Sequence, residues 1–146
     1  MSTSPFGVVA LKQIRRALVE EMVAHARAAA PAECCGLVGG RGAEARSVYP
    51  LRNVAAAAEK AYEAAPEDLF DAQRRMRERG ERLLAVYHSH PRSEDPAPSE
   101  KDVRLAFYPE AVYFIVGFER GGQGVVRAFR IYEAEGRWES ADVRVV

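Results

Sequence analysis

The sequence predicts a single α/β domain that is rich in strands and contains three helices. Apolar residues recur at helical spacing in two long segments, and several short apolar runs are separated by turns that contain glycine or proline. At 146 residues the chain has the length of one domain and can bury a core without disulfides or a structural metal. Because no repeat, linker or low-complexity segment divides it, residues 1–146 are expected to form one domain.

The first half of the chain predicts two helices. Residues 13–29 are expected to form an amphipathic helix, whose inner face carries Ile14, Leu18, Met22 and His25. Pro31 ends this helix. A second helix begins at Pro66, carries acidic residues in its first turn, where the helix dipole favours anions, and ends at Gly80. Strands are expected at residues 8–11, 34–38 and 46–51 and in the stretch around Tyr62.

The second half predicts one short helix among strands. The apolar run at residues 83–88 is expected to be a strand, and residues 99–107 a short helix. Further strands are expected at residues 112–118, 125–132 and 137–145, separated by turns at Gly121-Gly122 and Glu135-Gly136.

Composition argues against nucleic-acid and membrane partners. Lys+Arg and Asp+Glu both number 21, so no strongly basic surface is expected. The arginine-rich run at residues 74–82 is more typical of a solvated helix face than of a docking site for an acidic partner. The first ten residues lack a signal-peptide pattern, and no apolar run is long enough to span a bilayer. The adjacent thiols Cys34 and Cys35 are expected to stay reduced, because a disulfide between them would be strained. These features favour a cytoplasmic protein.

Two histidines indicate a metal site. His88 and His90 lie two residues apart at the end of a predicted strand, so their side chains project from the same face. A Pro-rich loop and then Asp102 follow, and this carboxylate can complete a three-ligand site. Three nitrogen and oxygen ligands leave a fourth position for water, which is the arrangement of a catalytic zinc. One zinc per chain is therefore expected.

Several nearby residues also have structural interpretations. Ser99 and Asp102 have the spacing of a capping box, which would fix the direction of the Asp102 carboxylate, so both roles are compatible. His25 is expected to be a structural residue of the first helix, and the two cysteines to pack in the core rather than act as nucleophiles. Glu33, taken alone, is typical of a solvated carboxylate near a helix end.

The combined motif resembles the JAMM (MPN+) metalloprotease family. The segment Pro31-Ala32-Glu33-Cys34-Cys35-Gly36-Leu37 is similar to the glutamate segment of that family. Its metal motif is similar to His88-Ser89-His90-Pro91 with Pro98-Ser99-Glu100-Lys101-Asp102. The resemblance covers about residues 14–116 and is closest to short bacterial and archaeal members, which lack the insertions of the eukaryotic deubiquitinases. The loop at residues 91–98 is one residue longer than is usual in the family, which is expected to affect the substrate cleft more than the metal site.

The resemblance implies a cytidine-deaminase-like JAMM/MPN fold, with a mixed, mostly antiparallel sheet flanked by helices. It implies zinc ligands at His88, His90 and Asp102. Glu33 is implied as general base and acid, and Ser99 as the hydroxyl donor to the oxyanion. The implied reaction is hydrolysis of a peptide or isopeptide bond at the C-terminal glycine of a ubiquitin-like or sulfur-carrier protein that ends in Gly-Gly.

Two other functions stay open at the level of the residues. A non-haem iron oxygenase also uses two histidines and one carboxylate, but it would leave Glu33 and Ser99 without a role and favours an all-strand jelly roll. A catalytically silent interaction module of the same fold is the second alternative, although silent relatives typically lose ligands that this chain retains.

Overall fold

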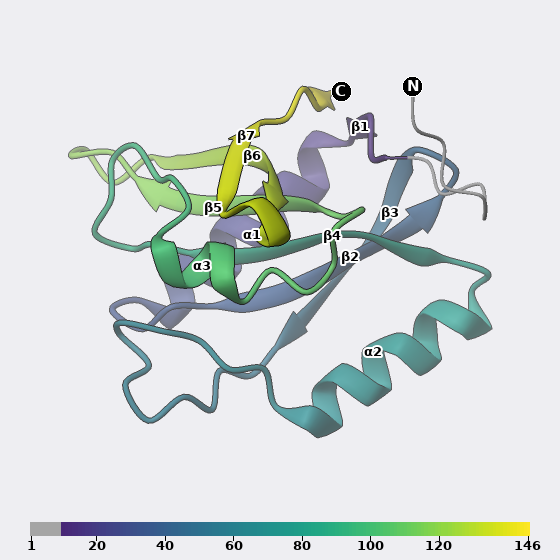
Figure 1. The fold of residues 1–146 in the computed structure, drawn as a ribbon, viewed down its shortest axis with the longest axis horizontal. Helices are drawn as coiled ribbons and strands as arrows, with labels where there is room; N and C mark the ends of the chain where they lie inside the picture. Colours follow the sequence, from purple (N-terminus) through teal and green to yellow (C-terminus); the bar gives the residue numbers. More distant parts are fainter. Residues whose placement is uncertain (1–9) are drawn as a thin grey trace.

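The computed structural model describes residues 10–146, which form an eight-stranded sheet with helices on both faces (Figure 1). The strand order is β7-β6-β5-β4-β2-β3-β1-β8. The helices are α1 (Arg16–Ala29), α2 (Pro66–Glu78) and α3 (Glu100–Arg104), with a 3₁₀ turn at Glu133–Glu135. The strands are β1 (Gln13–Ile14), β2 (Cys35–Arg41), β3 (Glu44–Leu51), β4 (Arg82–Ser89), β5 (Val112–Phe118), β6 (Gly124–Tyr132), β7 (Arg137–Ser140) and β8 (Arg144–Val145).

The sheet is mixed and strongly curled. Four of its strand pairs are antiparallel, and three are parallel, namely β4–β5, β1–β3 and β1–β8. In a flat sheet β7 and β8 would lie about 34 Å apart. Residues 141–143 alone connect them, and such a link spans at most about 14 Å. The two ends of the strand order are therefore brought together by curling, and the amide of Ala141 donates to Ala128 in β6 at 2.9 Å.

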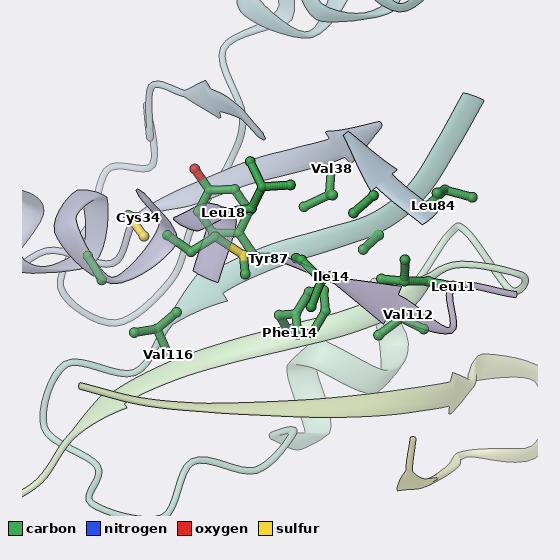
Figure 2. Close-up of a cluster of buried hydrophobic side chains, with 14 residues drawn as sticks. Leu11, Ile14, Leu18, Cys34, Val38, Leu84, Tyr87, Val112, Phe114 and Val116 are labelled. Carbon is green, nitrogen blue, oxygen red and sulfur yellow. The ribbon is translucent and has the colours of Figure 1, made fainter. Parts of the chain in front are cut away.

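Each face of the sheet carries its own hydrophobic core. Helix α1 covers one face, where Leu18 packs in a cluster with Tyr87 of β4 and Phe114 of β5 (Figure 2). Helices α2 and α3 cover the other face, with Met76 and Val103 in the second cluster. In Figure 1, α1 lies behind the sheet and α3 in front of it. Because successive strand residues point to opposite faces, neighbouring positions on β4 serve both cores.

Most of the predicted elements are present, and α2 begins at Pro66 as expected. The first helix starts at Arg16 rather than residue 13, because Gln13 and Ile14 pair with β8 as a short parallel strand. Of the strand predicted at residues 8–11, residues 8 and 9 lie outside the described residues, and residues 10 and 11 are not in a strand. The strand predicted at residues 34–38 continues through Gly39 and Gly40, where its pairing with β3 shifts.

The strand predicted around Tyr62 is wrong. Residues 56–60 form a turn, and the segment contributes one isolated bridge, between Asn53 and Ala64. The third helix is also shorter than predicted, since it ends at Arg104, and the strand predicted at residues 137–145 is divided into β7 and β8. None of the helices in the described part of the chain has the length and apolar character of a membrane span.

Candidate functional site

The two histidines of the predicted metal motif lie beside each other at the end of β4. The strand ends at Ser89, and its alternation places the rings of His88 and His90 on the same face. Their Nε2 atoms are 3.1 Å apart. The side chain of His88 is 1% exposed and that of His90 is 20% exposed. The Nε2 atoms of a buried imidazole and of a partly exposed imidazole therefore lie close enough to share one ligand.

Asp102 reaches this point from the first turn of α3. Its Oδ2 atom lies 3.2 Å from Nε2 of His88 and 3.1 Å from Nε2 of His90. The same oxygen accepts a hydrogen bond from the Ser99 amide at 2.9 Å, while the Ser99 hydroxyl oxygen accepts from the Asp102 amide at 3.1 Å. The predicted capping box is thus present, and it fixes the direction of the carboxylate. Burial opposes ionisation of Asp102, but hydrogen bonds from the two histidines outweigh it and hold its pKa well below its usual range.

This set of atoms fits a zinc ion. Ligand bonds of about 2.0–2.1 Å in a tetrahedron separate the ligand atoms by roughly 3.3–3.4 Å. The three separations among His88, His90 and Asp102 are 3.1–3.2 Å. Two imidazole nitrogens and a carboxylate oxygen are also donors that zinc accepts readily. The carboxyl of Glu33 belongs to a wider group with both histidines, in which one potential ligand atom from each residue lies within 4.8 Å of the others.

Glu33 is brought to the histidines by the pairing of β2 with β4. Cys35 is opposite His88 in this antiparallel pair, so Glu33, two residues earlier, lies beside His90. Its backbone is held from the other side, where the Glu33 amide donates to Ala58 at 2.8 Å and its carbonyl accepts from the Asn53 side chain at 2.9 Å. Glu33 is 9% exposed, and burial raises the pKa of its carboxyl, an effect that the nearby histidines oppose. A raised pKa suits a group that both accepts and returns a proton.

Tyr62 is a site residue that sequence reasoning did not identify. Its ring stacks on His88, with centroids 4.8 Å apart and planes inclined by 28°. Nδ1 of His88 is buried and has no hydrogen-bond partner among the described residues. Metal-bound histidines usually donate this N–H to an oxygen, which fixes the ring. The stacked Tyr62 ring restricts the orientation of the His88 ring.

The loop that carries Tyr62 is ordered by one side chain. Asn53 donates to the carbonyls of Glu33 and Ala61, and its carbonyl oxygen accepts from the amides of Ala55 and Glu63. An asparagine in a loop is a known signal for backbone capping of this kind. No local signal in the sequence places residue 62 against residue 88, because the contact joins two segments that are far apart in the chain.

Ser99 and His90 both line a small pocket at the site. The pocket has a volume of about 120 Å³ and is lined by Glu33, Lys60, Ala61, Tyr62, His90, Ser99, Lys101, Asp102 and Leu105. The Ser99 oxygen accepts the helix-capping hydrogen bond, so its own O–H remains available to donate into the pocket. All five residues singled out from the sequence therefore come together.

Three further sequence interpretations agree with the structure. Cys34 and Cys35 are each 1% exposed, and burial raises the pKa of their thiols to about 11 and about 12, which disfavours a thiolate nucleophile. His25 lies on α1, where its Nδ1 is 2.7 Å from the Tyr87 hydroxyl, away from the metal motif. Arg74 in the basic run forms ion pairs along the exposed face of α2.

Comparison with known proteins agrees with these observations. A family model described as prokaryotic homologs of the JAB domain matches residues 15–132. A desampylase from Haloferax volcanii is 39% identical over 103 residues, which cover 66% of this chain and 73% of the relative. A probable TtuB-protein conjugate cleaving protease from Thermus thermophilus is 39% identical over 123 residues, covering 84% of this chain and 77% of the relative. A CysO-cysteine peptidase from Mycobacterium tuberculosis is 33% identical over 129 residues, 87% of each chain.

Solved structures with the same fold are also known. The solution structure of a protein from Desulfitobacterium hafniense has a TM-score of 0.79 and 33% identity, covering 93% of both chains. A JAB1/MPN domain protein from Archaeoglobus fulgidus has a TM-score of 0.57 and 22% identity, covering 93% of this chain and 99% of the other. The second likeness concerns the fold alone. It confirms the predicted JAMM/MPN fold, which differs from the jelly roll of the oxygenase alternative.

Proposed function

The chain belongs to the family of prokaryotic homologs of the JAB domain, and on this premise we propose that it is a zinc-dependent peptidase. The proposed reaction is hydrolysis of the amide bond at the C-terminal glycine of a ubiquitin-fold or sulfur-carrier protein. The observation that carries the proposal is the convergence of two imidazole nitrogens and one carboxylate oxygen beside Glu33 and Ser99. The choice of substrate is supported by the desampylase, the probable TtuB-protein conjugate cleaving protease and the CysO-cysteine peptidase. The names of the last two describe cleavage of a protein conjugate or of a carrier joined to cysteine.

We propose His88, His90 and Asp102 as the zinc ligands, with one zinc per chain. When bound, the ion supplies Lewis acidity and lowers the pKa of a coordinated water to about 7. Strand β4 positions the two histidines, and the capping box positions the carboxylate. The ionised Asp102 also contributes the negative charge that favours a cation.

We propose Glu33 as the general base and acid. Its carboxylate takes a proton from the attacking water and passes it to the leaving nitrogen. One water is consumed: its oxygen bonds to the glycine carbonyl carbon, the carbon–nitrogen bond breaks, and the amine leaves with the transferred proton. The Ser99 hydroxyl donates to the oxygen on which negative charge develops. No covalent enzyme intermediate is needed, because the attacking nucleophile is water.

Two further assignments accompany this function. A single domain over residues 1–146 is supported by the one sheet that includes every described strand. A cytoplasmic location is supported by the two cysteines, which are buried and free of any disulfide, as is typical of reducing compartments.

Metal analysis of the purified protein tests the zinc site. We expect about one zinc per chain, and we expect His88→Ala to remove it, because a three-ligand site that loses one ligand binds weakly. His25→Gln is the matched control, since it changes a histidine outside the site and should retain zinc. Stoichiometric iron in protein prepared without added metal, with zinc unable to support activity, would favour an oxygenase.

Glu33→Gln tests the catalytic role. The variant should bind zinc and melt like the wild type, but it should not cleave a carrier protein joined through its C-terminal glycine to an amine, because an amide cannot accept the proton. Glu59→Gln, which changes an exposed glutamate paired with Arg92, should cleave normally. Near-normal turnover by Glu33→Gln would exclude Glu33 as the base.

A further inference from the structure

The residue between the two histidines of the metal motif has no role in the proposed mechanism. Ser89 points to the face of the sheet opposite to His88 and His90, because successive residues of a strand alternate. It is 0% exposed, and the described residues that line the catalytic pocket do not include it. Its neighbours at alternate positions of β4, Ala85 and Tyr87, belong to the hydrophobic core on the α1 side. Ser89 therefore lies apart from substrate and metal, and its hydroxyl serves a partner inside the protein.

That partner is the backbone next to Glu33. The Ser89 hydroxyl oxygen accepts a hydrogen bond from the Cys34 amide at 2.8 Å, and the Ser89 amide donates to the Cys34 carbonyl at 3.2 Å. In a regular antiparallel pair both bonds would run between backbone groups. A side-chain oxygen takes the place of the backbone carbonyl at the point where β2 begins and β4 ends. The hydroxyl thus extends the strand pairing to the peptide group that follows Glu33.

Glu33 needs this support because it precedes β2 and lies outside every strand of the described chain. Three hydrogen bonds fix the two peptide groups that flank its side chain. The Glu33 amide donates to Ala58 at 2.8 Å, and the Glu33 carbonyl accepts from Asn53 at 2.9 Å. The third is the bond from the Cys34 amide to Ser89. Because the carbonyl and this amide belong to one planar peptide unit, Asn53 and Ser89 hold opposite ends of the same plane.

Of these three bonds, the one to Ser89 ties Glu33 to the metal motif itself. Asn53 and Ala58 belong to the segment between β3 and α2, whereas Ser89 lies between the two histidines proposed as zinc ligands. Strand β4 is in turn fixed on its other side by its pairing with β5, which extends to Ser89. The position of the base relative to the metal ligands is therefore constrained most directly at residues 34 and 89, where the hydroxyl makes the shorter of the two bonds.

We propose that Ser89 is a positioning residue, whose hydroxyl holds the Glu33 carboxylate where it can exchange a proton with the attacking water. This inference rests on the proposed function and adds a residue to it. Proton transfer needs heavy atoms within about 2.6–3.2 Å, and a misplacement of about 1 Å lowers the rate by on the order of 10²-fold. A hydroxyl in an apolar core is unfavourable unless it is hydrogen-bonded, so packing alone would favour alanine at this position.

Kinetics of two variants test the role. The substrate is a carrier protein joined through its C-terminal glycine to an amine. Ser89→Ala should lower kcat by about tenfold or more, while KM and zinc content stay near the wild-type values, because substrate and metal do not touch this residue. Ser89→Thr retains the hydroxyl and should recover most of kcat. Ser47→Ala is the matched control: it removes a serine hydrogen bond to Glu81 in β3, opposite Gly39 and away from the site, and should leave kcat unchanged.

A double change shows whether Ser89 acts through Glu33. In Glu33→Asp the carboxylate is already displaced by one methylene group, so the addition of Ser89→Ala should lower kcat far less than it does in the wild type. A purely structural effect of Ser89→Ala would be the same in both backgrounds. Equal losses in the two backgrounds, or an unchanged kcat in Ser89→Ala, would therefore overturn the positioning role.

Hydrogen exchange measured by NMR gives a readout that does not depend on turnover. The Cys34 amide should be protected in the wild type and should exchange about tenfold faster in Ser89→Ala, because its buried acceptor is gone. Rapid exchange of this amide in the wild type would overturn the role. Loss of zinc from Ser89→Ala would also overturn it, because the hydroxyl would then support the ligands rather than Glu33.

The two levels of the proposal fail differently. A wild type that cleaves the conjugate while Ser89→Ala has unaltered kinetics overturns the positioning role alone. A zinc-loaded wild type that cleaves no carrier conjugate overturns the proposed peptidase function and the positioning role with it.

Discussion

Ser99 allows the structural and catalytic demands on one residue to be separated. Its oxygen accepts the Asp102 amide at 3.1 Å, so Ser99→Ala leaves that amide without its capping partner. Losing such a cap costs about 1 kcal/mol, which corresponds to a fall of about 3–4 °C in Tm for a chain of this size. The hydrogen bond to Oδ2 of Asp102 is donated by the backbone amide of residue 99, which the substitution does not remove. The Asp102 carboxylate should therefore keep its position, and zinc should stay bound.

The catalytic cost should be much larger than the structural one. Removing a single donor to a developing oxyanion lowers turnover by about 10²–10³-fold. Ser99→Gly should lose turnover equally while costing only a few tenths of a kcal/mol, because glycine is a good cap. Ser99→Asp also caps well but places negative charge where negative charge develops, so it should be stable and nearly inactive. Ser99→Thr retains the hydroxyl and serves as the positive control.

The assay pairs thermal melts with turnover of a carrier conjugate and with metal content for all four variants. The predicted pattern is that stability follows capping ability, while turnover follows the presence of the hydroxyl. Fully active Ser99→Gly or Ser99→Asp protein would leave Ser99 with a capping role only. Loss of zinc from Ser99→Ala would show that the side-chain cap, and not the backbone hydrogen bond, positions Asp102.

Four further predictions concern parts of the fold that support the site. Gly36→Ala should destabilise the protein by about 1–3 kcal/mol in chemical denaturation, because its Cβ would lie 2.2 Å from the Tyr87 ring; a wild-type midpoint would show that the ring can move. Asn53→Ala should cost about 2 kcal/mol and lower turnover, since the loop over His88 loses its side-chain hydrogen bonds; unchanged turnover would contradict this role. Cys34 and Cys35 should resist alkylation at pH 8 until the protein unfolds, and rapid labelling of folded protein would contradict their burial. Because the folded state holds these thiol protons more tightly than the unfolded chain, stability should fall as pH rises from about 9 to about 12.

The metal motif was predictable because its geometry is local. Two histidines at alternate positions of a strand share a face, and a serine three residues before an aspartate is a local signal for a capping box. The same holds for α2, where a proline start and acidic first turn mark the helix. The sequence indicates a catalytic role for Glu33 only through the family resemblance, because the spacing between Glu33 and His88 carries no local structural signal.

Tertiary structure supplies the contacts that bring Glu33 and Tyr62 to the metal motif. The pairing of Cys35 with His88 places Glu33 beside His90, and long-range packing brings Tyr62 onto the His88 ring. The stretch around Tyr62 makes one isolated bridge instead of a strand, and the Asn53 side chain bonds to the Ala61 carbonyl and the Glu63 amide, where a neighbouring strand would otherwise pair. The sequence does not indicate β1 or the separation of β8 from β7, because these two-residue strands are defined by parallel pairing between segments far apart in the chain. Periodicity in a sequence reports contacts within a segment, whereas register, sheet curvature and loop packing depend on contacts between segments.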